Sequence, residues 1–123
     1  ASDVYKRQDR LAPLSEEFGN NILELLKKNS DLDGIFATSD VMAANIIRAC
    51  KKMGKRVPED ISIVGFDDTW ISTLTYPSIT TIHQPVREMC EYAIEAIVKK
   101  VKSEKVPSQV VFPVELIDRE STK

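Results

Sequence analysis

The sequence predicts an α/β fold in which a mostly parallel sheet is flanked by helices. Two short apolar runs, residues 34–38 and 61–66, are rich in β-branched and aromatic residues and have the composition of buried strands. Between them, apolar residues recur at helical spacing from residue 43 to residue 53, and Gly54 ends the pattern. A strand, a helix and a second strand in this order form a right-handed parallel unit, which is the basis of the predicted fold class.

Four further segments complete the predicted elements. A helix is expected from Ser15 to Lys28, where apolar residues recur at helical spacing behind an acidic first turn. A short extended piece covers residues 79–83, and the cleanest apolar stripe in the sequence predicts a helix over residues 85–102, with Pro85 in its first position. A last strand is expected over residues 110–117, at an edge or with a bulge because it contains a proline.

Composition and charge exclude several functions. The chain has 123 residues, with 17 Lys and Arg against 19 Asp and Glu, and a formal net charge of −2. A nucleic-acid groove needs clustered basic residues, and this sequence has none. No apolar run is long enough to span a membrane, so no membrane partner is expected. Cys50 and Cys90 are isolated on apolar helix faces, which predicts buried thiols in a reducing, cytoplasmic compartment.

Polar residues follow both strands of the predicted parallel unit. Ser39 and Asp40 come after the first strand, and Asp67 and Asp68 come after the second. Parallel strands end at the same edge of a sheet, where open α/β sheets bind their ligands. Either Ser39 or Asp40 could be the N-cap of the following helix, and Asp40 suits a cap better than a ligand contact. Asp67 is the better ligand candidate, although an Asx-turn would explain it as well.

The sequence gives little support to an enzyme. Asp67 and Asp68 could bind Mg²⁺, but adjacent residues on an extended backbone point apart and no third ligand follows at a telling interval. His83 and Cys90 could form a nucleophile pair, yet Cys90 lies within an apolar stripe and no orienting acid is indicated. The common phosphate-binding and hydrolase motifs are absent from the sequence. No catalytic residue, metal or cofactor is therefore predicted.

Three blocks of sequence resemble one known family. They read IFATSDVMAANIIRACKKMGKRVPEDISIVGFDDT from Ile35, YPSITTIHQPVREM from Tyr76, and DREST from Asp118. In this order and spacing they resemble the C-terminal part of the effector-sensing domain of LacI/GalR-family bacterial transcription regulators. The resemblance implies a two-lobed sensor of the type I periplasmic-binding-protein-like fold, which closes on a sugar or a nucleobase. It also implies that DNA is bound only through an N-terminal headpiece that is missing from this chain.

The resemblance further implies how the chain divides between the two lobes. Residues 11–83 and 109–120 would belong to the C-terminal lobe, and residues 84–102 would form a crossover and a helix of the N-terminal lobe. Residues 1–10 are expected to be a non-family or disordered leader. The apolar stripe of residues 86–101 would then lack its partner, so the isolated chain is expected to be marginally stable and to associate.

The resemblance also implies roles for individual residues. Ser39 and Asp67 match ligand-contacting positions, although the family often has Asn where this chain has Ser39. A hinge between the lobes is assigned to His83, Gln84 and Pro85. A homodimer surface is implied, and it is assigned to Ala43, Ala44, Ile47 and Tyr76.

Two other functions stay open on the sequence. One is a fragment of a periplasmic sugar-binding protein that feeds an ABC transporter, which would have the same fold. The other is a metal-dependent phosphoryl-transfer or receiver domain that uses Asp67 and Asp68. Trp70, which lies in an expected loop over residues 69–78, could stack on a ligand or pack against the domain.

Overall fold

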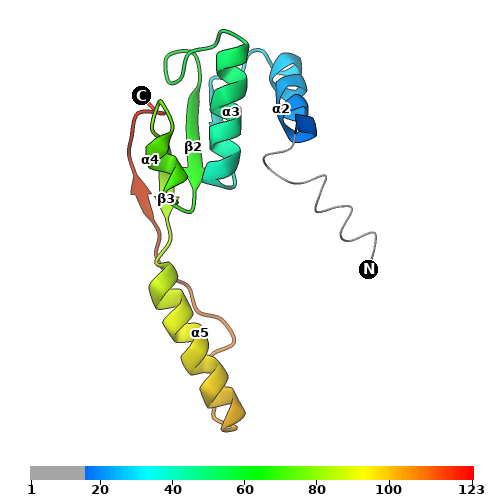
Figure 1. Ribbon diagram of the computed structural model, residues 1–123. Helices are drawn as coiled ribbons and strands as arrows, with labels where there is room; N and C mark the ends of the chain where they lie inside the picture. The colour runs from blue at the N-terminus through cyan, green and yellow to red at the C-terminus, as the bar shows by residue number, and fades with distance from the viewer. Residues whose placement is uncertain (1–15) are drawn as a thin grey trace.

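The computed structural model describes residues 16–123, with side chains from residue 19 onward (Figure 1). The expected leader over residues 1–10 and the expected helix start at Ser15 lie outside the described residues. The described elements are, in chain order, α2 (Glu16–Lys28), β1 (Gly34–Phe36), α3 (Asp40–Lys52), β2 (Ser62–Phe66), α4 (Ile71–Leu74), β3 (Thr80–His83), α5 (Val86–Val101) and β4 (Glu115–Ile117).

The four strands form one sheet in the order β1-β2-β3-β4. The first three strands are parallel, and β4 runs antiparallel to β3. Phe36 pairs with Val64 and Phe66 pairs with Ile82, so the carboxyl ends of β1, β2 and β3 lie at one edge. The predicted α/β class with a mostly parallel sheet is confirmed.

The helix α3 contributes more residues to the core than any other element of the described chain. Ser39 caps it, because the Ser39 hydroxyl accepts a hydrogen bond from the backbone N–H of Met42 at 3.2 Å. At the other end Gly54 has a φ of 71°, a left-handed conformation that glycine adopts without steric cost. Helix α3 packs against α2, against α4 and against β2. Their buried apolar residues are Ile22, Leu26, Ala43, Ile46, Ile47, Ala49 and Cys50, together with Ile61, Ile63 and Ile79.

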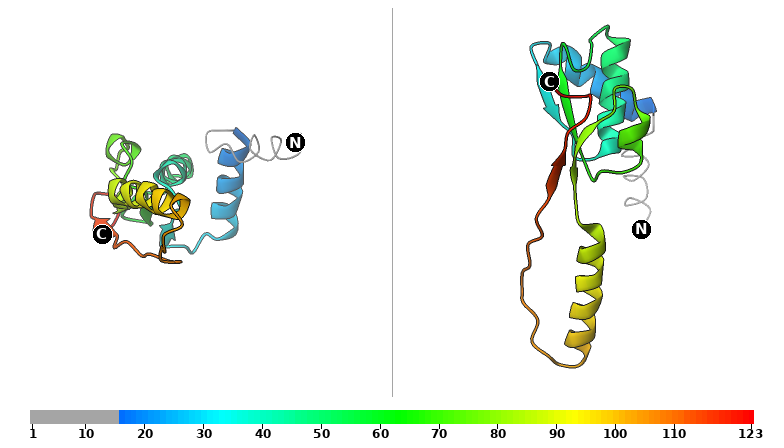
Figure 2. Two further views of the ribbon diagram at one scale, coloured as in Figure 1. Left: turned by 90° about the horizontal axis from the view of Figure 1, so that it is seen from below. Right: turned by 90° about the vertical axis from the view of Figure 1, so that its left-hand side faces the viewer.

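The opposite face of the sheet is not covered by a helix of the described chain. Phe36 and Leu116 are 59% and 60% exposed. Phe36 instead packs edge-to-face on Phe66, with ring centroids 6.2 Å apart. The expectation that β1 is a buried strand is therefore wrong for the face that carries Phe36. Helices α2, α3 and α4, which pack on one another, lie on the other side of the sheet (Figure 2).

The C-terminal residues fasten β4 to the rest of the sheet. Ser121 is fully buried, and its hydroxyl accepts a hydrogen bond from the backbone N–H of Thr80 and donates one to the carbonyl of Ile63. Glu120 accepts hydrogen bonds from both the backbone N–H and the hydroxyl of Ser78. The DREST motif thus contacts β2, β3 and the loop before β3, all of which lie far from it in sequence.

Residues 84–114 form an arm that projects from the sheet (Figures 1 and 2). Its helix α5 has no buried residue, and an extended segment returns beside it toward β4. Tyr92 and Phe112 make an edge-to-face ring contact between the two, with centroids 5.8 Å apart. The expected burial of Cys90 is wrong, because this side chain lies on the unpacked helix. Cys50 is buried as expected, and burial raises the pKa of its thiol.

Two element boundaries differ from the sequence prediction. The last strand was expected over residues 110–117 but comprises only Glu115–Ile117, because its partner β3 ends at His83, opposite Glu115. The segment expected as a loop contains the one-turn helix α4, in which Ser72 is buried. None of the helices over residues 16–123 is long and apolar enough to cross a membrane.

Candidate functional site

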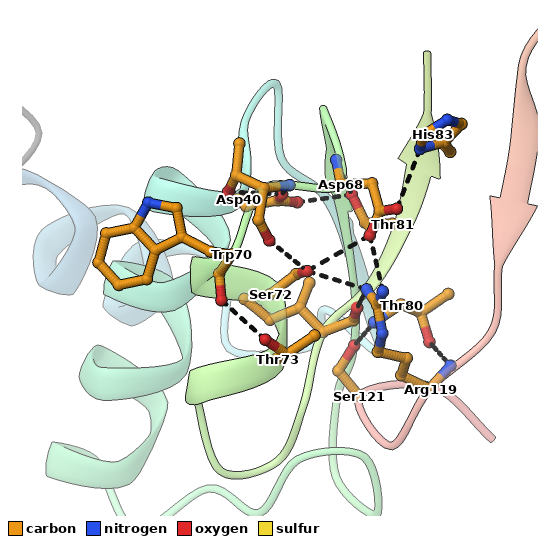
Figure 3. A network of polar contacts seen from close by, with 12 residues as sticks. Asp40, Asp68, Trp70, Ser72, Thr73, Thr80, Thr81, His83, Arg119 and Ser121 are labelled. Atoms are coloured by element: carbon orange, nitrogen blue, oxygen red, sulfur yellow. Dashed lines mark hydrogen bonds and ion pairs between the residues drawn. The ribbon is translucent and has the colours of Figure 1, made fainter. Parts of the chain in front are cut away.

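Ser39 and Asp40, the two residues that could cap the helix after β1, have different roles. Ser39, predicted to contact a ligand, caps α3, whereas Asp40, predicted to cap it, is the first residue of that helix and is completely buried. The Asp40 carboxylate accepts hydrogen bonds from the backbone N–H and the hydroxyl of Thr69, at 2.6 and 2.9 Å. It also accepts one from the hydroxyl of Thr81 (Figure 3). Because a hydroxyl both accepts and donates, the capping role leaves the Ser39 proton for a further bond.

The pair after β2 adopts an unusual backbone. Asp67 and Asp68 have φ angles of 97° and 49°, in a region that non-glycine residues rarely occupy. The backbone N–H of Asp67 donates to the carbonyl of Ile82 at 3.0 Å. Its half-buried carboxylate accepts one hydrogen bond, from the Gln84 side-chain amide at 2.7 Å. The second carboxylate oxygen of Asp67 accepts no hydrogen bond from any residue of the described chain.

Asp68 is fully engaged with neighbouring side chains. One of its oxygens lies 2.7 Å from the guanidinium of Arg119, and the other lies 3.0 Å from Nδ1 of His83 (Figure 3). The Arg119 guanidinium, assisted by His83, holds the pKa of the Asp68 carboxyl below its ordinary value. Arg119 also donates to the hydroxyl of Ser72 and to the carbonyl of Ile79, both at 2.9 Å.

This arrangement does not suit a divalent cation. The two adjacent carboxylates turn to different partners, Asp67 to Gln84 and Asp68 to Arg119 and His83. A cation bound to Asp68 would have to displace a guanidinium that is only 18% exposed. Within residues 16–123 no group of three or more His, Cys, Asp or Glu side chains is placed to hold a metal ion.

The expected hinge residues lie where the sheet passes into the arm. His83 is the last residue of β3, Gln84 follows it, and Pro85 stands directly before α5 rather than in its first turn. The side chains of His83 and Gln84 each contact one of the two aspartates after β2. The loop after β2 and the segment that leads into the arm are therefore joined by direct hydrogen bonds.

Comparison with known proteins identifies the family. Residues 3–122 match the family model described as a periplasmic binding protein-like domain. The chain belongs to this family. It is 42% identical over 101 residues to the transcriptional regulator MalR of Clostridium butyricum, and 37% identical over 100 residues to a ribose operon repressor of Halalkalibacterium halodurans. These alignments cover 82% and 80% of this chain and 30% of each relative, so the chain spans about a third of the length of the curated relatives it matches.

A solved structure extends the likeness to three dimensions. The complex of the transcriptional regulator CelR with cellobiose matches with a TM-score of 0.78 and 33% identity, over 84% of this chain and 32% of that one. The relatives of this periplasmic binding protein-like domain are thus LacI-type regulators, and the resemblance drawn from the three sequence blocks is confirmed. The chain is a part of an effector-sensing domain of this kind.

Two of the four residues expected at a dimer surface are buried in the core of this domain, and two are not. Ala43 is completely buried and Ile47 is 7% exposed, so both belong to the core that α3 forms with its neighbours, and the expectation fails for them. Ala44 is half-buried, whereas Tyr76 is 90% exposed. Trp70 and Leu74, near Tyr76 along the chain, are each 72% exposed, so Trp70 does not pack against the body of the domain.

Sequence reasoning missed three residues that shape the site. Thr69, Thr81 and Arg119 hold Asp40 and Asp68, but none was singled out. Arg119 lies within the DREST block. A basic residue in that block is a possible ion-pair partner for the acidic residues that follow the two predicted strands, and the sequence offers this signal. The pairing itself joins residues 51 positions apart, which no local pattern reveals.

Proposed function

We propose that the chain is the effector-sensing and dimerising segment of a bacterial LacI/GalR-type transcription regulator. It binds a small polar effector, a sugar in the first instance, at the carboxyl edge of the sheet. Effector binding controls DNA binding by a headpiece outside this chain. A regulator of this kind works in the cytoplasm, and the proposal assigns it no catalytic step.

The observation that carries this proposal is the state of Asp67. Its carboxylate stands at the edge where open α/β sheets bind ligands, with one oxygen held by Gln84 and the other without a partner among the described residues. A half-buried carboxylate oxygen of this kind is a strong acceptor for a sugar hydroxyl. Ser39, at the end of the neighbouring strand, offers a hydroxyl proton on the same edge.

The arm supports a division of the chain between two lobes. We infer that residues 11–83 and 109–120 belong to the C-terminal lobe and residues 84–102 to the N-terminal lobe. The exposed apolar stripe of α5 fits a helix that packs on a lobe outside this chain. Closure of the lobes would turn on His83, Gln84 and Pro85, and the Gln84–Asp67 hydrogen bond would connect that motion to the effector.

The choice of a regulator over a transporter component rests on the relatives. The similar proteins of known name are a ribose operon repressor, MalR and CelR, and the structure of CelR is a complex with cellobiose. A periplasmic sugar-binding protein of an ABC transporter would share the fold, but no observation on this chain favours it. A phosphoryl-transfer domain is disfavoured by the engagement of Asp68 with Arg119.

A thermal-shift panel on the complete regulator tests the effector class. We would add cellobiose, ribose, adenine and uracil separately and measure the melting temperature. A ligand at a hundredfold excess over its Kd stabilises the folded state by about 2.7 kcal/mol, which is readily measured. The proposal expects a sugar to raise the melting temperature. Stabilisation by a nucleobase alone would replace the sugar assignment, and no response to any of the four would count against it.

The dimer proposal now rests on Ala44 and on the exposed surface of Trp70, Leu74 and Tyr76. Apolar side chains this exposed on a folded body are typical of an interface. Ala44→Glu should shift the complete regulator from dimer to monomer in sedimentation velocity while its circular dichroism stays unchanged. Arg87→Glu, on the separate arm, is the control. An unchanged dimer in Ala44→Glu would contradict the assignment.

A further inference from the structure

Asp40 is the one charged side chain that is fully buried among the residues the structure describes. Burial of a carboxylate is unfavourable unless hydrogen bonds replace its hydration. Here three donors from two segments surround it: the N–H and hydroxyl of Thr69 and the hydroxyl of Thr81. Its position in the first turn of α3 adds the favourable end of the helix dipole. The charge is therefore well accommodated, and it is directed at the loop after β2.

Gly65 makes room for this carboxylate. A Cβ at Gly65 would lie 2.5 Å from Oδ1 of Asp40 and 3.0 Å from the Ile79 side chain. The absence of a side chain at this point of β2 lets the start of α3 approach the strand closely. The strand that leads into Asp67 is thus shaped around Asp40.

The two oxygens of the Asp40 carboxylate bind on either side of the loop after β2. Its Oδ2 atom holds Thr69, which follows the two aspartates. Its Oδ1 atom holds the hydroxyl of Thr81 on β3, and that hydroxyl also accepts a hydrogen bond from the backbone N–H of Asp68 at 3.4 Å. Asp67 and Asp68 have positive φ angles, which persist only where surrounding contacts hold them.

We propose that Asp40 is a positioning residue for the effector site: through Thr69 and Thr81 it fixes the loop that presents the Asp67 carboxylate at the sheet edge. This inference rests on the proposed function of Asp67. It separates two roles, since Asp67 meets the effector and Asp40 contacts only the protein. Loss of the Asp40 contacts should weaken effector binding without removing any group that touches the effector.

Two adjacent threonines provide a matched test. Thr80 and Thr81 are neighbours on β3, both are buried and both have hydrogen-bonded hydroxyls. Thr81→Val removes a hydroxyl that serves Asp40 and the loop, whereas Thr80→Val removes one that serves the C-terminal segment. Both substitutions keep the shape of the side chain. A general loss of stability would affect both variants, and a positioning role would affect only Thr81→Val.

The first readout needs no effector. Amide hydrogen exchange of residues 67–69 in the complete, unliganded regulator should be roughly tenfold faster in Thr81→Val than in Thr80→Val, as expected for the loss of a hydrogen bond to a charged group. Should Thr81→Val fail to fold, Thr69→Val replaces it in the same comparison. It removes the hydroxyl of half-buried Thr69 from Asp40 but leaves the backbone N–H contact, so a smaller increase is expected. Equal exchange of the loop in the two variants would overturn the inference.

The second readout is affinity for cellobiose and for ribose, measured by separate calorimetric titrations. Thr81→Val should bind the responding sugar about tenfold more weakly than the wild type, and Thr80→Val should bind within about twofold of it. Equal affinities in both variants would overturn the positioning role while leaving the effector proposal intact. A wild type that binds neither sugar would count against the effector proposal, and the exchange experiment would still decide whether Asp40 holds the loop.

Discussion

The body of the domain and its arm carry apolar patterns of similar quality but bury them differently. In the body, α3 places Ala43, Ile46 and Ile47 in the core. In the arm, α5 has no buried residue, and Ile94 and Ile97 are each 63% exposed. Periodicity therefore predicts that a helix has a face to bury, but not whether the partner lies in the same chain.

This difference bears directly on function. The site residues Asp67 and Gln84 meet where the body passes into the arm. A binding edge at the junction of a packed region and an unpacked one is what a sensor that closes between two lobes requires. Under the proposed division, residues 84–102 of the arm would be the part of the second lobe that this chain contributes, and the exposed stripe of α5 would be the surface on which that lobe packs.

The largest difference in stability is expected between two isoleucine-to-alanine substitutions, one in the body and one in the arm. Ile63 is completely buried in β2, whereas Ile94 is mostly exposed on α5. Ile63→Ala should lower the free energy of unfolding of the chain by about 3 kcal/mol through lost burial and a cavity. Ile94→Ala should lower it by less than about 1 kcal/mol, because little area is buried there. Urea unfolding measures both, and equal losses would break the comparison.

An intermediate effect should appear at the junction as the pH falls. The folded-state pKa of Asp68 is lowered by Arg119, so its contribution to stability is present above the ordinary value of 3.8 and is lost as the pH falls through the lowered value. Asp68→Asn should therefore be less stable than the wild type at neutral pH and should lose less stability on acidification. Urea unfolding between pH 7 and about pH 2 measures this.

Asp60 provides the reference for that experiment. Hydrogen bonds from Arg56 lower its pKa to about 2, so it contributes in the same acidic range from an exposed turn. The Asp68→Asn variant should keep the acid dependence that Asp60 contributes. A pH profile identical to that of the wild type would show that the Asp68–Arg119 pair does not stabilise the junction.

The smallest effect on stability, but a clear one on behaviour, is expected from the arm surface. The isolated chain should bind a fluorescent dye that reports exposed apolar surface, and should associate at high concentration. Replacing Ile94 and Ile97 with Lys should reduce both dye fluorescence and association while leaving the urea midpoint of the body nearly unchanged. Unchanged fluorescence would show that the dye binds outside the α5 stripe, and would contradict the prediction that this stripe causes association.

Local patterns were sufficient for part of the fold. The α3 stripe ended by Gly54, the two parallel strands and the common edge of Ser39 and Asp67 all follow from periodicity and connection rules. The extent of β4 did not follow, because a strand needs a partner and β3 ends at His83. The Arg119–Asp68 pair did not follow either, because it depends on how distant segments meet.

The dimer residues show a second limit of sequence reasoning. Small and apolar residues at helical spacing suit a core and an interface equally, so Ala43 and Ile47 could not be assigned to either from the pattern. Packing of α3 against β2 and α2 decides for the core. Buried Asp40 is similar, because an acidic residue before a helix suggests a cap and only the neighbouring threonines reveal its actual partners.

The most direct test of the account is the effect of Asp67 on sugar affinity. Calorimetric titration of the sugar that stabilises the complete regulator should show binding at least about tenfold weaker in Asp67→Asn than in the wild type, since a charged acceptor is lost. Asp60→Asn, which removes a carboxylate from the turn before β2, should bind like the wild type. Equal affinity in the two variants would contradict the placement of the effector at this edge of the sheet.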